Sequence, residues 1–436
     1  MEIWLITLIV FTLLVVFLLT GVPIAFVLLA IGVLGTFFVW GSKGLLMISQ
    51  TAYGEGTDYI LLAIPLFVLM ANVLKFSGMA DELYEIAYRW MGRLRGGLAM
   101  GTVAICAIFA AMSGISSAAT VSMGLIALPS MLSRGYDKSL ALGSINAGGA
   151  LGILIPPSII MVLYGSMTDV SVGRLFAGGI IPGIILTAIF ILYIAIRCAF
   201  NKELGPPGKE RFTLQQKLAT IRGVISPLLL VILVLGVMYL GVATPTEAAG
   251  IGAVGAFVAA AIHRRLSWKN VKNSLIDTMG LTVMIFWLII GANTFTHFLA
   301  YAGIQDMLQQ AILSLNINRW LIMIIIQGIY FILGCFLDPA GILLLTAPIF
   351  VPVITDLGFD PLWFGIVFTV NMEMAYITPP FGFNLFILKG VAPPEITMTD
   401  LYKSVWPFVV CQAIALAIIM AWPELVLYLP SLMVKG

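Results

Sequence analysis

Charged side chains are scarce in this sequence. Asp, Glu, Lys and Arg make up 10% of the 436 residues, against 61% hydrophobic residues, and the mean hydropathy is +1.10. Soluble domains carry about 25% charged residues, so this composition excludes an ordinary soluble fold. It predicts an all-α protein that crosses the lipid bilayer many times.

The few charges nearly cancel, and metal-ligating residues are rare. The net charge is +2, from 22 basic and 20 acidic residues, so nucleic acid is not an expected partner. The two histidines, His263 and His297, have neither a nucleophile nor a metal-ligand cluster near them in sequence, so we do not expect an enzyme. The four cysteines stand singly in or beside apolar stretches, and ordinary packing is their expected role.

Long apolar runs are abundant. A membrane-spanning helix needs about 20 apolar residues, and about ten stretches reach or approach this length. They are 3–20, 22–40, 59–77, 139–165, 175–197, 224–241, 245–262, 276–298, 362–390 and 404–422. The first run begins at Ile3 without the basic leader and small-residue cleavage site of a secretory signal, so we expect a retained first helix.

Two further apolar stretches, 98–134 and 318–356, are interrupted by small or polar residues. The interruptions, at 113–119 and 338–341, leave arms of only about 15 apolar residues, which is short of a full crossing. Each stretch therefore predicts a re-entrant hairpin. Non-helical backbone at that depth is tolerated only where protein or a wet cavity surrounds it.

The chain repeats itself. The stretch 129–157 returns as 352–380, with the tripeptide GYD matching GFD and a proline pair closing both stretches. Halves of this kind, each with a proline-broken apolar segment, point to a transporter whose binding site lies between them. The predicted organisation is a first repeat over 1–200 with a broken helix at 139–165, a cytoplasmic linker over 201–223, and a second repeat over 224–436 with a broken helix at 362–390.

Basic loops set the expected orientation. Three loops rich in Lys and Arg are expected in the cytoplasm. They contain Lys75, Arg89, Arg93 and Arg95; Arg197, Lys202, Lys209, Arg211, Lys217 and Arg222; and Arg264, Arg265, Lys269 and Lys272. Counting crossings from these loops places the amino terminus outside, the ends of the first hairpin in the cytoplasm and those of the second hairpin outside. The two repeats are therefore expected to be inverted.

The tip of the first hairpin reads SGISSAAT, from Ser113 to Thr120. Small residues let the backbone turn without bulk. Hydroxyls and freed carbonyls supply the oxygen ligands that a hard cation such as sodium prefers. The alternative is that these hydroxyls only pack helices closely or bond to carbonyls one turn back.

The first broken helix contains NAGGALGILIPPS, from Asn146 to Ser158. Pro156 and Pro157 remove amide donors and disfavour helix just before them, so carbonyls near Gly152 lose their partners. Those carbonyls can hold a cation. A structural kink without a ligand is the alternative.

The tip of the second hairpin reads FLDPAG, from Phe336 to Gly341. Asp338 is one of only two acids deep in an apolar segment, and an unpaired carboxylate there costs at least about 2.5 kcal/mol. It needs a partner. A bound cation would serve, as would a backbone amide or a hydroxyl in a structural helix cap.

The second broken helix contains NMEMAYITPPFGFN, from Asn371 to Asn384, and repeats the plan of the first. Glu373 lies here near mid-membrane, and its repeat partner is Ala150, so the halves are not chemically equal. Glu373 is a candidate to carry a coupling proton, to contact an ion, or to make a buried hydrogen bond to a neighbouring helix. The elements of the two breaks are Gly152, Pro156, Pro157, Pro379, Pro380 and Gly382.

Together these motifs resemble the large membrane subunit of tripartite ATP-independent periplasmic (TRAP) transporters, of the dicarboxylate-permease type. The resemblance runs from GVPIAF at Gly21 to the final helix and rests on SGISSAAT, GILIPPSIIMVLYG, FLDPAG and YITPPFGFNLF in this order. It implies an elevator-type fold, in which the hairpins and broken helices move against a scaffold of the remaining helices.

By matching position, the resemblance implies two sites for sodium as the coupling ion, and no other cofactor. The first site would be framed by Ser113, Ser116, Ser117, Thr120, Asn146 and Gly149. The second would be framed by Asp338, Pro339, Met374 and Thr378. Where many members carry Gly beside the second break, this chain has Ala375.

The resemblance also implies partners and a location in the bacterial inner membrane. A small membrane subunit of about four helices would brace the scaffold, and a periplasmic binding protein would deliver an organic acid, such as a dicarboxylate or a sugar acid, to hairpin tips and helix ends. No Lys or Arg lies in the predicted core, Lys389 standing at its edge. The alternative is a stand-alone anion transporter of related fold, coupled to sodium or to protons.

Overall fold

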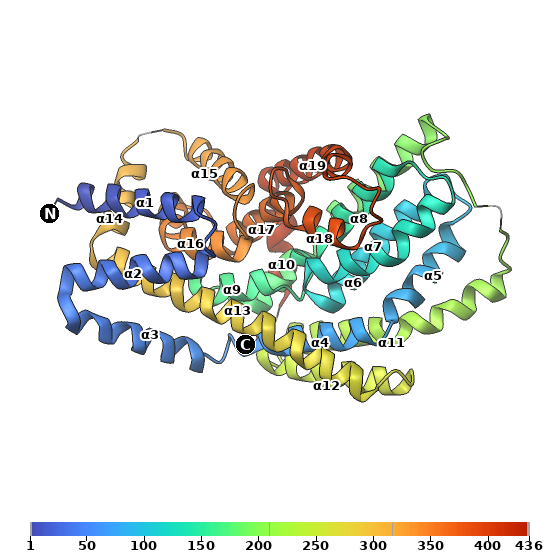
Figure 1. Cartoon of the computed structure of the whole chain (residues 1–436), viewed down its shortest axis with the longest axis horizontal. Helices are drawn as coiled ribbons and strands as arrows, with labels where there is room; N and C mark the ends of the chain where they lie inside the picture. Colours follow the sequence, from blue (N-terminus) through green and yellow to red (C-terminus); the bar gives the residue numbers. More distant parts are fainter. Residues whose placement is uncertain (1, 209, 316, 434–436) are drawn as a thin grey trace.

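The computed structural model describes residues 2–208, 210–315 and 317–433. Over these ranges the chain is built from helices, with no β-strand, so the all-α prediction is confirmed (Figure 1). The first half contains α1 (Ile3–Leu19), α2 (Ile24–Trp40), the 3-10 helix η1 (Gly41–Leu45), α3 (Leu46–Thr57), α4 (Ala63–Phe76), α5 (Met79–Met91), α6 (Gly97–Ser113), α7 (Ser116–Ser133), α8 (Lys138–Ala150), η2 (Leu151–Ile153), α9 (Ile159–Thr168) and α10 (Val172–Phe200). The second half contains α11 (Leu214–Tyr239), α12 (Pro245–Ile262), α13 (Trp268–Tyr301), α14 (Ile304–Leu313), α15 (Arg319–Gly334), α16 (Pro339–Asp356), α17 (Pro361–Ile377), α18 (Phe383–Val391), α19 (Met398–Ala421) and α20 (Glu424–Leu432). Lys209 and the side chain of Arg222, both assigned to the basic linker, lie outside what is described.

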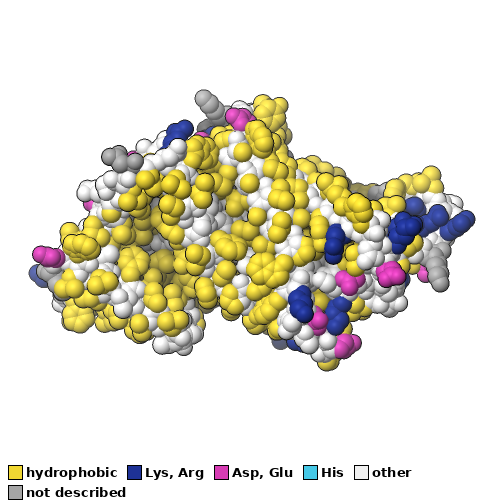
Figure 2. All heavy atoms as spheres, turned by 90° about the horizontal axis from the view of Figure 1, so that it is seen from above, with side chains coloured by type: hydrophobic (Ala, Val, Ile, Leu, Met, Phe, Trp, Pro, Cys, Tyr) yellow, Lys and Arg dark blue, Asp and Glu magenta, His cyan; other side chains and the backbone are white. Residues whose placement is uncertain are grey.

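Many helices present apolar side chains on their outer surfaces. Seven of the described helices are long and apolar enough to cross a membrane. Large side chains such as Phe38 and Ile332 are exposed rather than buried in the core. Figure 2 shows a largely hydrophobic surface on the visible face, with Lys and Arg gathered mostly toward one end. A polytopic membrane protein is therefore confirmed, whereas the count of about ten spans remains a prediction.

Helices of the first half of the chain pack against helices of the second half. α2 packs on α13, and α4 packs on α12. α7 of the first hairpin packs on α18, which Figure 1 shows in orange beside it, and α16 of the second hairpin packs on α9. Each hairpin therefore contacts the broken helix of the other half. The repeat boundaries and their inversion stay predictions.

The interruptions predicted from sequence coincide with helix ends. α6 and α7 are separated only by Gly114 and Ile115, and α15 and α16 by residues 335–338. Gly114 has φ +61°, a left-handed conformation that glycine adopts without strain. A Cβ at this position would also overlap the Pro157 carbonyl oxygen of the first break. Glycine is thus required where the first hairpin tip meets the first broken helix.

Some helices begin at a side-chain cap, and the position of such a cap cannot be predicted from the apolar stretches of the sequence. The Thr213 hydroxyl accepts a hydrogen bond from the Gln216 amide, and the Gln216 side chain accepts one from the Thr213 amide. This capping box starts α11 at Leu214, inside the segment 201–223 that the sequence predicts to be a linker. The short helices α3, α5, α14 and α20 also lie outside the predicted spans, because each is too short or too polar to read as a membrane crossing.

Candidate functional site

A cavity of about 100 Å³ lies between the two hairpin tips, the two broken helices and the long helix α13. We call it the central cavity. It is lined by Gly114, Ile115, Ser116, Ser117, Ile153, Ile159, Ile160, Leu281, Met284, Ile285, Leu288, Asp338, Ala340, Tyr376 and Phe383. All four segments singled out in the sequence for their chemistry therefore contribute to one cavity.

Four helix N-termini meet at the central cavity. Ser116 begins α7, Ile159 begins α9, Ala340 is the second residue of α16, and Phe383 begins α18. The first turn of a helix carries amide donors without intrahelical partners and the positive end of the helix dipole. The positive ends of four helix dipoles therefore converge on the cavity, with Ser158 capping α9 and Asp338 capping α16.

A hydrogen bond joins the first hairpin tip to the second broken helix. The Ser116 hydroxyl donates to Asn384 Oδ1 at 2.9 Å, and Asn384 Nδ2 donates to the Asn146 carbonyl at 3.4 Å. All three residues are buried. Asn384 closes the PPFGFN motif, but nothing in the sequence indicated that it would reach the other half. The packing of α7 of the first hairpin on α18 brings Asn384 to Ser116.

Close packing brings further residues of the predicted first sodium site together. A Cβ at Gly149 would overlap the Thr120 hydroxyl, and a Cβ at Gly152 would lie 2.8 Å from the Ser116 backbone. Thr120 donates to the Ser116 carbonyl at 3.1 Å, one turn back, which is the structural role given above as the alternative for these hydroxyls. Asn146 Oδ1 is buried and has no hydrogen-bond partner among the described residues.

The other two residues of this set lie at the same tip with different surroundings. Ser113 is buried, and its hydroxyl donates to the Ile115 carbonyl at 3.4 Å across the turn. Ser117 is half-buried and lines the central cavity. Ser116 and Ser117 of this set therefore line the central cavity, whereas Ser113 bonds within the turn.

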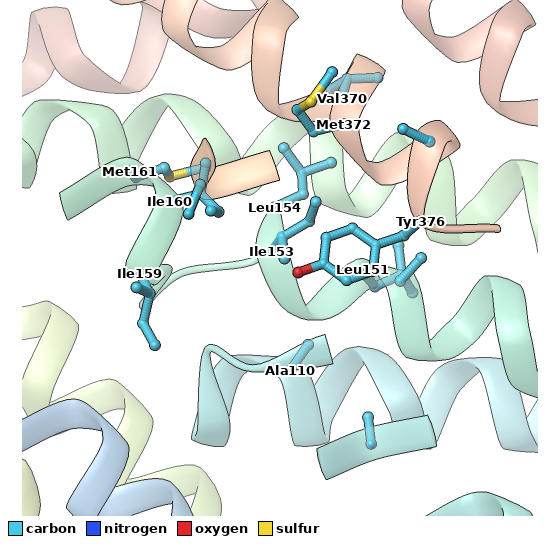
Figure 3. Packing of buried hydrophobic residues seen from close by; sticks show 14 of the residues in the cluster. Ala110, Leu151, Ile153, Leu154, Ile159, Ile160, Met161, Val370, Met372 and Tyr376 are labelled. Carbon is cyan, nitrogen blue, oxygen red and sulfur yellow. The ribbon is translucent and has the colours of Figure 1, made fainter. Parts of the chain in front are cut away.

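Both broken helices are interrupted at their proline pairs, where the Pro156-Pro157 and Pro379-Pro380 peptide bonds are cis. In the first break the Ser158 hydroxyl caps α9 and donates to the Ile153 carbonyl. Figure 3 shows Ile153 and Leu154 of this break beside Tyr376 near the second break, so the two breaks meet.

The second predicted sodium site is built around a helix cap. Asp338 Oδ2 accepts from the Gly341 amide at 3.0 Å and caps α16, with Pro339 as the first helical residue. The cap given above as an alternative is thus present, while the same side chain also lines the central cavity. Within the described ranges, no hydrogen bond joins Asp338 to Thr378 or Met374. Thr378 donates instead to the Met374 carbonyl at 2.7 Å.

The second hairpin tip is nevertheless held against the second break. The Phe381 amide donates to the Cys335 carbonyl at 3.3 Å, and Tyr402 donates to the Pro380 carbonyl at 2.9 Å. Gly382 has φ +45° just before α18. A Cβ at Gly334 would overlap the Ala375 side chain, so hairpin and broken helix are in close contact where this chain has Ala instead of Gly.

Glu373 is fully buried in α17 but does not line the central cavity. In the part of the chain that the structure describes, neither of its carboxylate oxygens has a hydrogen-bond partner. The buried hydrogen bond to a neighbouring helix, one of its three predicted roles, is therefore not seen there.

Known proteins match this chain along most of its length. Residues 11–425 match the family described as "Tripartite ATP-independent periplasmic transporter, DctM component". The C4-dicarboxylate TRAP transporter large permease protein of Pseudomonas aeruginosa is 37% identical over 374 residues, covering 86% of this chain and 86% of that protein. The corresponding protein of Rhodobacter capsulatus is 33% identical over 441 residues, covering 98% and 99%.

Among solved structures, the YdaH transporter of Alcanivorax borkumensis is similar with a TM-score of 0.64 at 15% sequence identity. The match covers 92% of this chain and 97% of that chain, and it supports a transporter fold. The family match and the two permease relatives confirm the resemblance inferred from the motifs. The chain therefore belongs to the DctM component family of TRAP transporters and is a multi-pass permease of the inner membrane, not an enzyme.

Proposed function

We propose that this permease imports an organic acid in a sodium-coupled manner. The observation that carries the proposal is the central cavity, where four helix N-termini converge. Their amides and dipoles stabilise a carboxylate, and within the described chain no Lys or Arg lines this cavity. Relatives named for C4-dicarboxylates support a dicarboxylate or a similar organic acid as the substrate.

Asp338 supplies the reason for coupling to a cation. Its carboxylate lies on the wall of a cavity whose other features favour an anion. Two negative charges in one site of low polarity repel each other, and a bound cation removes that repulsion. Sodium at Asp338 would therefore strengthen substrate binding, and the substrate would strengthen sodium binding.

The first hairpin tip offers a second place for sodium. Asn146 Oδ1 is buried and has no hydrogen-bond partner in the described chain. The backbone carbonyl of Asn146 accepts from Asn384, whose Oδ1 accepts from the Ser116 hydroxyl. An oxygen of this kind is a suitable sodium ligand, because ion binding offsets the cost of burying it unpaired. Both proposed ion sites thus adjoin the proposed substrate site.

An elevator motion is supported by the character of the wall that faces the hairpins. α13 contributes Leu281, Met284, Ile285 and Leu288 to the central cavity, all of them apolar. Sliding along such a wall breaks no hydrogen bonds or ion pairs. The hairpins and broken helices, which pack on one another, would move as a unit and carry substrate past α13.

Family membership implies a small membrane subunit and a periplasmic binding protein as partners. The test is succinate uptake into proteoliposomes that contain the permease and the small subunit, with the binding protein outside and an inward sodium gradient. We expect uptake only when all three proteins and the gradient are present. Uptake by the permease alone would support the stand-alone alternative, and uptake driven by a proton gradient without sodium would contradict sodium coupling.

A further inference from the structure

A second cavity, of about 460 Å³, adjoins the central cavity. We call it the vestibule. It lies between α4, α7 and α13, and it shares Ile115, Ser117 and Leu281 with the central cavity. Only these shared residues therefore need to stand between the two cavities.

The vestibule leads toward the predicted cytoplasmic side. Its wall contains Lys75, in the last turn of α4, where the first basic loop begins. At the second hairpin tip α16 packs on α13, and Gly341 faces Ile24 of α2. A Cβ at Gly341 would lie 3.1 Å from the Ile24 side chain. The cavity that adjoins the central cavity on the α4 side is therefore the one that contains Lys75.

Lys75 is the one cationic side chain on the walls of these two cavities, as far as the structure describes them. Its ammonium lies 3.2 Å from Asp277 Oδ2 of α13, and the two side chains are 28% and 44% exposed. About one helical turn before Lys75, Asn72 donates a hydrogen bond to the Thr278 hydroxyl at 3.1 Å and holds α4 against α13. Half-exposed ion pairs add little to stability, so Lys75 can exchange one carboxylate for another at small cost.

We propose that the vestibule is the release route of the organic anion to the cytoplasm, and that Lys75 exchanges Asp277 for a carboxylate of the departing substrate. The inference rests on the proposed organic-acid function. A cation at this point lowers the energy of the anion after it leaves the helix N-termini, while the nearby Asp277 recaptures Lys75 and limits how long the substrate stays.

The route can be tested by thiol labelling without any substrate. The four native cysteines are buried. Gly280 lines the vestibule, Gly328 is exposed on α15, and a Cβ at either position meets nothing within 4 Å. In inside-out vesicles that contain the complete transporter, we expect a membrane-impermeant maleimide to label Gly280→Cys about tenfold faster than Gly328→Cys. Equal rates would overturn the route.

Lys75 can be tested by protection of the same thiol. With sodium present, we expect succinate or gluconate to slow the labelling of Gly280→Cys. The concentration needed for half-protection should rise about fivefold in Lys75→Gln and stay unchanged in Lys75→Arg. The matched control is Lys138→Gln, which removes a comparable ion pair to Asp400, 3.4 Å long, outside the vestibule. It should change nothing.

Unchanged protection in Lys75→Gln, or no protection by either acid, would overturn the carboxylate site at Lys75. The uptake assay decides the proposed function separately. If the wild-type complex takes up neither acid, the proposed substrate class is wrong, whereas the labelling rates of Gly280→Cys and Gly328→Cys still decide whether the vestibule opens to the cytoplasm.

Discussion

The Ser116 hydroxyl, at the tip of the first hairpin, donates a hydrogen bond of 2.9 Å to Asn384 at the start of α18 in the other half of the chain. Both side chains are buried. This contact ties a hairpin to the broken helix against which it packs and places both beside the central cavity. If the tip binds sodium as proposed, this hydrogen bond would link ion binding to the arrangement of the opposite half.

We expect Ser116→Ala to raise the sodium concentration for half-maximal uptake about fivefold, since one buried hydrogen bond is lost and Asn384 Oδ1 loses its donor. Measurement of succinate uptake against sodium concentration checks this. The control is Ser133→Ala at the exposed end of the same helix, where the hydroxyl bonds only to the Ser130 carbonyl. An unchanged sodium dependence in Ser116→Ala would remove this residue from the ion site.

The coupling of Ser116 to Asn384 can be measured directly. Because the two side chains share one hydrogen bond, the effects of Ser116→Ala and Asn384→Ala on sodium affinity should not add. We expect an interaction energy of about 1 kcal/mol in a double-mutant cycle. Additive effects would show that the two residues act independently.

Asp338→Asn should abolish sodium-dependent uptake while leaving the protein folded. Asn also serves as a helix cap, so the hydrogen bond from the Gly341 amide is kept and only the charge is lost. Asp360→Asn is the matched control, since Asp360 caps α17 through the Leu362 amide at 2.7 Å away from the central cavity. Wild-type sodium dependence in Asp338→Asn, measured by uptake, would contradict the second ion site.

Gly152→Ala should destabilise the contact between the first break and the hairpin tip. The added Cβ would lie 2.8 Å from backbone atoms of Ser116, and such overpacking costs about 1–3 kcal/mol. Thermal unfolding in detergent should show a lower midpoint. Gly328→Ala is the control, because a Cβ there meets nothing within 4 Å. Equal unfolding midpoints for Gly152→Ala and Gly328→Ala would show that the backbone at Ser116 can move to accept the added Cβ without loss of stability.

Glu373→Gln should leave sodium-dependent uptake intact, because Glu373 is buried away from the central cavity. The measurement is uptake over a range of pH at saturating and at low sodium. A flattened pH profile with unchanged sodium dependence would assign Glu373 a proton-carrying role. Loss of sodium dependence would contradict the placement of both ion sites.

Much of the fold could be predicted because its signals are local. The apolar runs, the proline pairs and the small-residue interruptions each act on the backbone where they stand, so the helix breaks at Pro156 and Pro379 follow from sequence. The start of α11 did not follow, since the capping box of Thr213 and Gln216 is polar and lies outside any apolar run.

The site was harder to predict because its contacts join distant segments. No sequence pattern around Asn384 indicates its contact with Ser116. The residue at the matching position of the other repeat is Met161, so the repeat does not predict the contact either. Lys75 belongs to a basic loop in the sequence, and only the packing of α4 on α13 brings it to a cavity wall beside Asp277.

Sodium binding to the folded permease can be measured by thermal unfolding of the purified protein in detergent, with sodium titrated against choline at constant ionic strength. An ion that binds only the folded state stabilises it by about 2.7 kcal/mol at 100 times its dissociation constant. We predict a saturable rise in the unfolding midpoint with sodium that is reduced in Ser116→Ala and in Asp338→Asn. Equal midpoints in sodium and choline would contradict sodium binding by the folded permease.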